Sequence, residues 1–155
     1  YYSSYFAEVA EYLTMEGQDE RNILNLLFMT FLAMKKKLIP LSLIRRIYEL
    51  KILQFAGFGL QCFQCVHCGN DENLIRISFE DGGMLCSTCA AKGQGREVDP
   101  SVLYVLQFVS SVPLNQLYSF ALKETIEKEF EWIVNRYFTI HVEHKFKSAE
   151  MLAIL

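Results

Sequence analysis

Apolar residues recur at helical spacing along most of this chain. Residues 3–16, 20–37, 41–56, 101–110 and 123–141 each carry apolar side chains three or four positions apart. Pro40 and Pro113 interrupt the pattern between these segments, as expected where helices end. The pattern therefore predicts five helices, with a short final turn over residues 148–155 that packs back onto them.

The periodicity also predicts which side of each helix is buried. Residues 20–37 are apolar on most faces, so we expect them to form the central core helix. We expect Gly17 to end the helix before it and Asp19 to cap its own start. The inward positions predicted for the other helices are Tyr5, Phe6, Val9, Ala10 and Leu13; Leu43, Ile44, Ile47, Tyr48, Leu50, Ile52 and Leu53; Val102, Leu103, Val105, Leu106, Phe108 and Val109; and Ile126, Phe130, Ile133, Val134, Tyr137 and Phe138.

Residues 57–96 have a different character. Residues 74–79 alternate between apolar and polar side chains like a short strand, residues 80–83 read Glu-Asp-Gly-Gly like a turn, and Met84 and Leu85 supply a returning strand. The fold class we expect is mainly α, a helical bundle with an inserted β-hairpin module. The bundle comprises residues 1–56 and 97–155, and the module comprises residues 57–96.

Composition narrows the class of protein. Apolar residues make up 52% and aromatic residues 14% of the 155 residues, which excludes a disordered tail. The net charge of -3 excludes a wholly basic nucleic-acid coat protein. Residues 23–34, the most apolar stretch, are too short to span a membrane, and no signal peptide is recognisable. The chain begins with Tyr1 rather than Met, which suggests a piece of a longer protein.

Two pairs of cysteines give the strongest chemical signal. Cys65 and Cys68 form one CxxC pair, Cys86 and Cys89 form another, and seventeen residues separate the pairs. Two-residue spacing lets a tight turn direct both thiolates at one ion, and two such turns supply a tetrahedral set. Clustered cysteines without a secretion signal indicate a reducing cytosol. We therefore predict one structural zinc in a zinc-ribbon-like module, with no open coordination position for catalysis.

Other residues of this segment allow alternatives. Cys62 and Cys65 also form a CxxC, but we favour Cys62 as a small buried residue. His67 could replace a cysteine ligand, although its place inside the first pair favours a solvated side chain. His141-Val142-Glu143 matches the H-x-E of zinc deaminases, but it follows the cysteines instead of preceding them, so we expect no enzyme. His141 and His144 are expected at a helix end.

A local basic region stands out in this acidic chain. Residues 34–51 contain six basic residues and one acid, Glu49, whereas residues 1–20 contain five acids and no base. A solvated helix end is one interpretation. The other is a docking strip for phosphates or for an acidic peptide, formed by Lys35, Lys36, Lys37, Arg45 and Arg46 beside the apolar Leu38, Ile39 and Leu41.

Several of these stretches together resemble the C-terminal part of the RecO family of bacterial DNA repair proteins. Residues 48–58 resemble its F-E-L-x-L-L and L-G-Y run, with Tyr48, Ala56 and Phe58 in place of Phe, Leu and Tyr. Residues 65–69 resemble its C-x-x-C-G, and residues 82–90 resemble its G-G-x-L-C-x-x-C-A. Residues 137–141 and 147–152 resemble its Y-x-x-x-H and K-S-x-x-x-L. Cys62 falls where the family usually has an apolar residue.

The resemblance implies a cytoplasmic, nucleoid-associated recombination mediator. Such a protein anneals complementary single strands and, with RecR, helps load RecA onto DNA coated by single-stranded-DNA-binding protein. It also implies that the helical domain can receive the acidic C-terminal tail of that coating protein. The family's main single-strand-binding module is an N-terminal OB-fold, and nothing in this sequence resembles one. The competing hypothesis is a generic zinc-ribbon scaffold that binds another protein and has no role on DNA.

Overall fold

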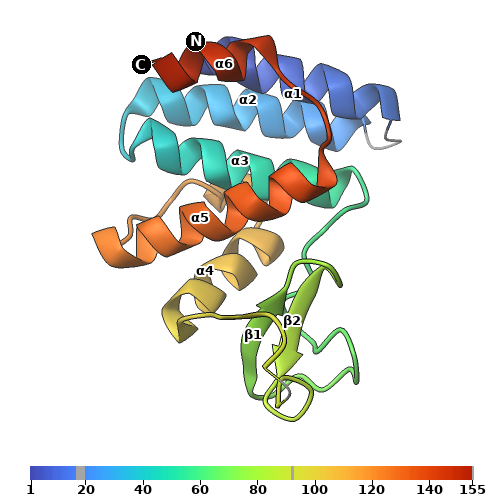
Figure 1. Ribbon diagram of the computed structural model, residues 1–155. Helices are drawn as coiled ribbons and strands as arrows, with labels where there is room; N and C mark the ends of the chain where they lie inside the picture. Colours follow the sequence, from blue (N-terminus) through green and yellow to red (C-terminus); the bar gives the residue numbers. More distant parts are fainter. Residues whose placement is uncertain (17–19, 92, 155) are drawn as a thin grey trace.

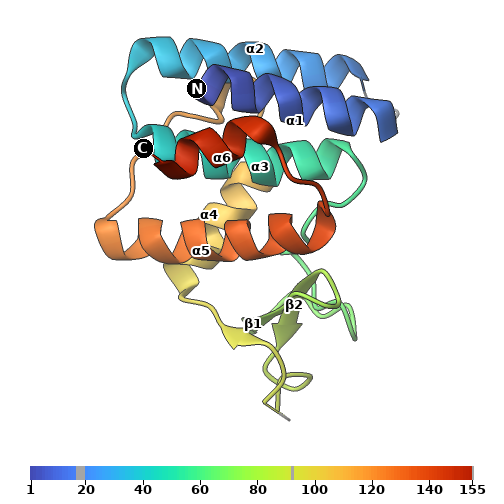
Figure 2. The same ribbon diagram turned by 45° about the horizontal axis from the view of Figure 1, so that its top comes forward.

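Six α-helices and a small antiparallel sheet account for most of residues 1–16, 20–91 and 93–154, the part of the chain that the computed structural model describes (Figures 1 and 2). The expected caps Gly17 and Asp19 lie outside these residues. The elements are α1 (Tyr2–Glu16), α2 (Glu20–Lys36), α3 (Leu41–Phe55), β1 (Leu74–Ser78), β2 (Gly83–Cys86), β3 (Arg96–Glu97), α4 (Pro100–Ser111), the 3-10 turn η1 (Leu114–Gln116), α5 (Glu124–His141) and α6 (Lys147–Ile154). The predicted class, a mainly helical bundle with a small sheet, is confirmed.

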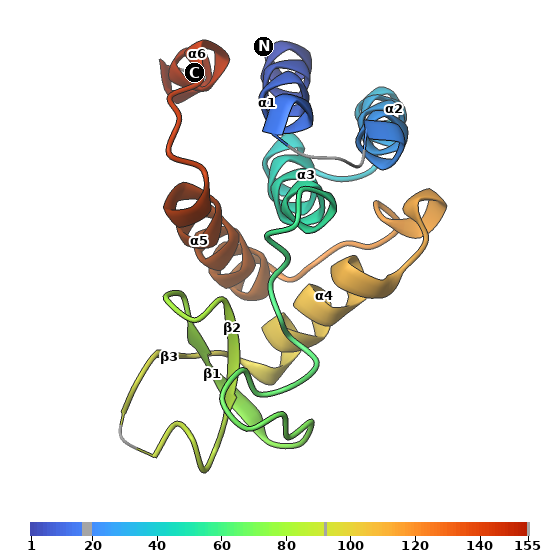
Figure 3. The same ribbon diagram turned by 90° about the vertical axis from the view of Figure 1, so that its right-hand side faces the viewer.

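Helix α3 lies at the centre of the bundle. It contacts α1 and α2 on one side and α4 and α5 on the other, and the sheet lies at the end of the molecule furthest from α1, α2 and α6 (Figure 3). Every inward position predicted for α3 is buried, and so are the two charged residues between them, Glu49 and Lys51. No helix among the described residues is long and apolar enough to cross a membrane.

The prediction that α2 is the central helix was wrong. Only Ile23, Leu26, Thr30 and Ala33 of α2 are buried, whereas the side chains of Leu24, Phe28 and Phe31 are 55%, 63% and 38% exposed. Helix α2 lies at the edge of the bundle and packs on α1, α3 and η1. An apolar pattern on most faces shows that a helix can be covered, but it does not show which faces the fold covers.

The remaining inward positions agree with the predicted stripes. All five in α1 are buried, as are Phe130, Ile133, Val134, Tyr137 and Phe138 of α5. Ile126 of α5, together with Leu103 and Phe108 of α4, is only partly buried. Asp99 caps α4 by accepting a hydrogen bond from the Ser101 N–H at 2.7 Å. Periodicity therefore identified the buried faces of α1, α3, α4 and α5.

The predicted hairpin is present, and a third strand extends it. Strands β1 and β2 pair with Ile77 opposite Met84, and β3 pairs with the other edge of β1, giving the order β2-β1-β3. Two-residue β3 is too short to show an alternating pattern, which is why the sequence did not reveal it. Ile77, Met84, Leu60 and Val98 belong to the same hydrophobic cluster as the helices. The inner face of the sheet therefore shares one core with the bundle.

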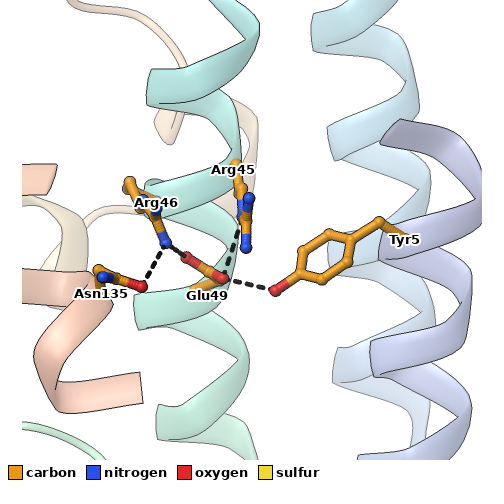
Figure 4. A network of polar contacts seen from close by, with 5 residues as sticks. All are labelled: Tyr5, Arg45, Arg46, Glu49 and Asn135. Atoms are coloured by element: carbon orange, nitrogen blue, oxygen red, sulfur yellow. Dashed lines mark hydrogen bonds and ion pairs between the residues drawn. The ribbon is translucent and has the colours of Figure 1, made fainter. Parts of the chain in front are cut away.

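A buried carboxylate connects the helices (Figure 4). Glu49 is fully buried, and it accepts hydrogen bonds from the Tyr5 hydroxyl at 2.5 Å, from Arg46 at 2.7 Å and from Arg45 at 3.3 Å. Arg46 also donates to the Asn135 side chain of α5 at 3.2 Å. Burial and the neighbouring carboxylate raise the pKa of Tyr5 far above its ordinary value, so its hydroxyl remains a donor. This network ties α1, α3 and α5 together through one negative charge.

Helix α6 is held at its start by a carboxylate from α1. Glu8 accepts hydrogen bonds from the backbone N–H groups of Lys147 at 3.0 Å and Ser148 at 3.1 Å, and from the Ser148 hydroxyl. The two backbone donors are free N–H groups of a helix N-terminus, where a negative charge is stabilising. The expected final turn is therefore a helix of eight residues that docks on α1.

We predict that Glu49→Gln destabilises the fold by at least about 2 kcal/mol, because it leaves Arg45 and Arg46 without their buried counter-charge. The loss is measured from urea unfolding followed by circular dichroism. The control is Glu143→Gln, an exposed glutamate whose replacement should change stability by less than about 0.5 kcal/mol. A loss below about 1 kcal/mol for Glu49→Gln would show that the network is not structurally important.

We also predict that α6 detaches in acid. Burial raises the pKa of Glu8, but the hydrogen bonds from Ser148 and Lys147 outweigh it, so the pKa lies below its ordinary value. A carboxylate with a lowered pKa stabilises the folded state at neutral pH, and this contribution is lost as the pH falls through the region near and below about 4. Amide hydrogen exchange of residues 147–154 should accelerate there before that of α3. Glu8→Gln should show the same fast exchange at pH 7; slow exchange in this variant would contradict the mechanism.

Candidate metal centre and docking surfaces

Four sulfur atoms meet beyond the outer end of the hairpin. The Sγ atoms of Cys65, Cys68, Cys86 and Cys89 all lie within 4.8 Å of one another, and those of Cys68 and Cys86 are 3.6 Å apart. In a tetrahedral tetrathiolate site with metal–sulfur bonds of about 2.3 Å, the sulfurs are separated by about 3.8 Å. The four cysteines therefore fit the coordination of a single metal ion.

The backbone around the first cysteine pair explains this convergence. The Cys65 N–H donates to the Asn70 carbonyl at 2.7 Å, and the Gly69 N–H donates back to the Cys65 carbonyl at 2.8 Å. Gly69 has φ +79°, which closes this turn with little strain because glycine has no Cβ. The pair is then attached to β2 by the Val66 N–H, which donates to the Met84 carbonyl at 2.9 Å.

That attachment requires a glycine at the start of β2. A Cβ atom on Gly83 would lie 2.5 Å from both the Gln61 carbonyl oxygen and a Val66 methyl group, too close for any side chain. Strand β2 then ends at Cys86, whose carbonyl accepts from the Ala90 N–H at 2.9 Å to close the second turn. The prediction that the returning strand delivers Cys86 to the site is confirmed.

The surroundings of the sulfurs favour negative charge on some of them and disfavour it on others. Burial raises the pKa of Cys65, but the backbone N–H groups of Cys86, Cys68 and His67 outweigh this and lower it to about 6. The Cys89 N–H likewise lowers the pKa of Cys86. Cys89 itself is raised to a pKa of about 12, chiefly by hydrogen bonding with the Cys65 and Cys86 sulfurs. A bound cation would take the place of the proton through which the Cys89 thiol hydrogen-bonds to these sulfurs.

Cys62 is buried, as predicted, and it is not among the four cysteines whose sulfurs converge. Its side chain is fully buried and lies 3.6 Å from the Ser110 hydroxyl, and its carbonyl accepts from the Gln107 side chain at 2.8 Å. Burial raises the pKa of this thiol. Cys62 is therefore an anchor between the start of the module and α4.

His67 is exposed, as predicted, and its side chain contacts Asp81 of the hairpin turn. Its Nε2 lies 2.8 Å from an Asp81 carboxylate oxygen, which also accepts from the Ser78 hydroxyl at 2.9 Å. His67 therefore connects the first cysteine pair to the hairpin turn instead of joining the four sulfurs.

The sheet is attached to α5 by aromatic contacts that no pattern in the sequence predicts. The Arg96 guanidinium lies 3.8 Å from the ring centroid of Trp132, and Phe79 meets the same ring edge-on at 5.9 Å. Nearby, Tyr137 donates to the Phe58 carbonyl at 2.8 Å, and the His141 ring lies 4.1 Å from that of Tyr137. Arg96 and Trp132 lie far apart in the sequence, and no spacing pattern predicts that they meet.

The five basic residues singled out in the sequence occupy two different environments. Lys35, Lys36 and Lys37 are exposed at the end of α2. Arg45 and Arg46 are engaged with Glu49, and their side chains are only 22% and 18% exposed. The structure therefore does not bring all five together as one open strip.

A small apolar cavity adjoins the lysines. Its volume is about 170 Å³, and it lies between the end of α2 and the η1 segment. Lys36 borders it beside Leu38 and Ile39, the apolar residues that follow the three lysines in the sequence. The other walls are formed by Met29, Leu32, Ala33, Leu114, Asn115, Tyr118 and Ser119.

Comparisons with known proteins agree with the resemblance. The family described as "Recombination protein O C terminal" matches residues 1–150. Proteins named "DNA repair protein RecO" from Clostridium acetobutylicum, Alkaliphilus metalliredigens and Caldicellulosiruptor bescii are 27%, 26% and 28% identical to it over 99%, 97% and 94% of this chain. The chain spans 62%, 62% and 59% of their respective lengths.

No solved structure matches the chain. The family match nevertheless extends over all six helices except the end of α6, and it includes the sheet and the four cysteines. On that match, the chain belongs to the RecO C-terminal family of DNA repair proteins.

Proposed function

We propose that this chain is a docking and structural part of a DNA recombination mediator and is not itself an enzyme. In this proposal it supports annealing of single strands and loading of RecA onto DNA coated by single-stranded-DNA-binding protein. The observation that carries the proposal is the apolar cavity bordered by Lys36, because it offers a place for a partner to dock. For the whole protein we propose RecR and single-stranded DNA as further partners, in a cytoplasmic, nucleoid-associated setting.

The cavity matches the acidic tail of the coating protein in two respects. Apolar walls from α2 and η1 can receive an aromatic side chain, and Lys35, Lys36 and Lys37 can meet the acids that accompany it. Arg45 and Arg46 lie within the Glu49 network, so in this proposal they hold the helices in place and the lysines provide the attraction.

We propose zinc as the metal held by Cys65, Cys68, Cys86 and Cys89. Soft thiolates in a tetrahedral set favour this ion, and four protein ligands leave it no open position for catalysis. The ion would then stabilise the outer end of the module, where Cys65, Leu85, Cys86 and Ala90 form a small cluster separate from the main core.

For the metal, we predict that Cys86→Ser abolishes zinc binding, whereas Cys62→Ser retains one zinc per chain. Three sulfurs bind zinc much less tightly than four, and Cys62 lies outside the set. Metal content after dialysis, measured by mass spectrometry, gives the stoichiometry. Loss of zinc from both variants alike would mean that Cys62 has been assigned the wrong role.

For the cavity, we predict that changing Lys35, Lys36 and Lys37 together to Gln weakens binding of a synthetic peptide that ends in acids and a phenylalanine. Exposed charge contacts contribute about 0.3–1 kcal/mol each, so the combined loss from three of them should be at least about fivefold at low salt. Salt screens such contacts, so the difference should shrink as salt is added. Fluorescence anisotropy of a labelled peptide measures both effects.

The matched control changes three exposed lysines outside this cavity, Lys123, Lys128 and Lys145, to Gln. It alters the net charge equally and should leave the peptide affinity within about twofold of the parent. Equal binding by the two triple variants would rule out the cavity as the tail site.

A further inference from the structure

The outer face of α2 carries large apolar side chains that nothing in the described structure covers. Leu24, Phe28 and Phe31 are 55%, 63% and 38% exposed, and they lie on the side of α2 opposite its buried residues. Helix α2 forms the outer edge of the α1–α2 layer, furthest from the sheet (Figure 3). Contiguous exposed apolar side chains of this size mark interaction surfaces in folded proteins.

A cavity lies beside these side chains on the same layer. It measures about 410 Å³ and is lined by residues of both α1 and α2. Its α1 wall consists of Ala7, Ala10, Glu11 and Thr14, and its α2 wall of Leu24 and Leu27. Short side chains on α1 leave room here for a large side chain from outside. One surface therefore presents both projecting aromatic residues and a recess for them.

The charges around this surface have opposite signs at its two ends. Glu11 and Glu20 are exposed near the start of α2, where Arg21 offsets one of the two charges. Lys35 and Lys36 are exposed at its other end, in the last turn of the helix. Rotation by 180° about an axis through the middle of α2 would bring the acidic end of one copy onto the basic end of another.

We propose that this face, comprising Leu24, Phe28, Phe31 and the adjoining cavity, is a self-association surface that pairs two copies of this chain. The α2 helices would run antiparallel, with Phe28 near the two-fold axis and Phe31 of each copy directed toward the cavity of the other. A two-fold interface requires one patch to complement itself. In this arrangement the aromatic side chains of each copy would meet the recess of the other, and the acidic end of each would meet the basic end. The proposal is independent of the role of the chain in DNA repair.

Sedimentation velocity of the chain from micromolar to millimolar concentration should show a reversible monomer–dimer equilibrium. Phe28→Asp should weaken dimerisation by at least about tenfold, because it places a charge at the centre of the apolar contact. The control is Tyr104→Asp on α4, since Tyr104 is equally prominent at 68% exposure but lies on another helix. Circular dichroism checks that both variants remain folded.

A charge exchange tests the antiparallel arrangement. Changing Lys35 and Lys36 to Glu should weaken the dimer, and adding Glu11→Lys and Glu20→Lys to the same chain should restore it. Since Lys36 also borders the tail cavity, the monomeric Phe28→Asp variant separates the two sites: it should still bind the tail peptide.

Three results would overturn the proposal. One is a chain that stays monomeric at every concentration. Another is a dimer that survives Phe28→Asp. The third is failure of the exchanged charges to restore association.

Discussion

The carboxylate of Glu49 has no access to water, and three donors must reach it at once. Tyr5 of α1 is one donor, and Arg45 and Arg46 of α3 are the other two. Arg46 also donates to Asn135 of α5. A charge buried in this way is costly unless its partners hold their places, so it restricts how the helices can slide past one another. The apolar stripes make the helices pack, and any arrangement that moved Tyr5, Arg45 or Arg46 away from Glu49 would leave its charge buried without those partners.

Periodicity predicted the helices and four of the buried faces because burial acts directly on side-chain spacing. The convergence of the two cysteine pairs was also predictable, because a two-residue spacing lets one tight turn direct both thiols at the same point. The pattern failed at α2, where apolar residues lie both inside and outside, and at Arg45 and Arg46, which were counted as surface charges. The sequence did carry one signal: Glu49 and Lys51 are the two charged residues in an otherwise apolar run from Ile47 to Leu53, and both are buried. A charge within such a run is more often held by a partner than solvated.

The sequence boundary of the cysteine-bearing segment does not coincide with a boundary in packing. Residues 57–96 differ from the helices in composition, yet Ile77 and Met84 lie in the bundle's core. Only the outer end, around Cys65 and Cys86, has a hydrophobic cluster of its own. The composition of a segment indicates its local structure. Its packing depends also on residues distant in the chain, such as Val102 and Phe130 in the shared core, and a single sequence does not show which distant residues these are.

The contact between Arg96 and Trp132 gives the molecule a built-in spectroscopic probe. Trp132 is the single tryptophan of the chain, and its ring lies between a strand of the sheet and the helix that carries it. A guanidinium 3.8 Å from an indole ring alters both its surroundings and its access to quenchers. Tryptophan emission therefore shows, without any added label, whether the sheet remains packed on the bundle when a metal or partner binds elsewhere or when the pH is lowered.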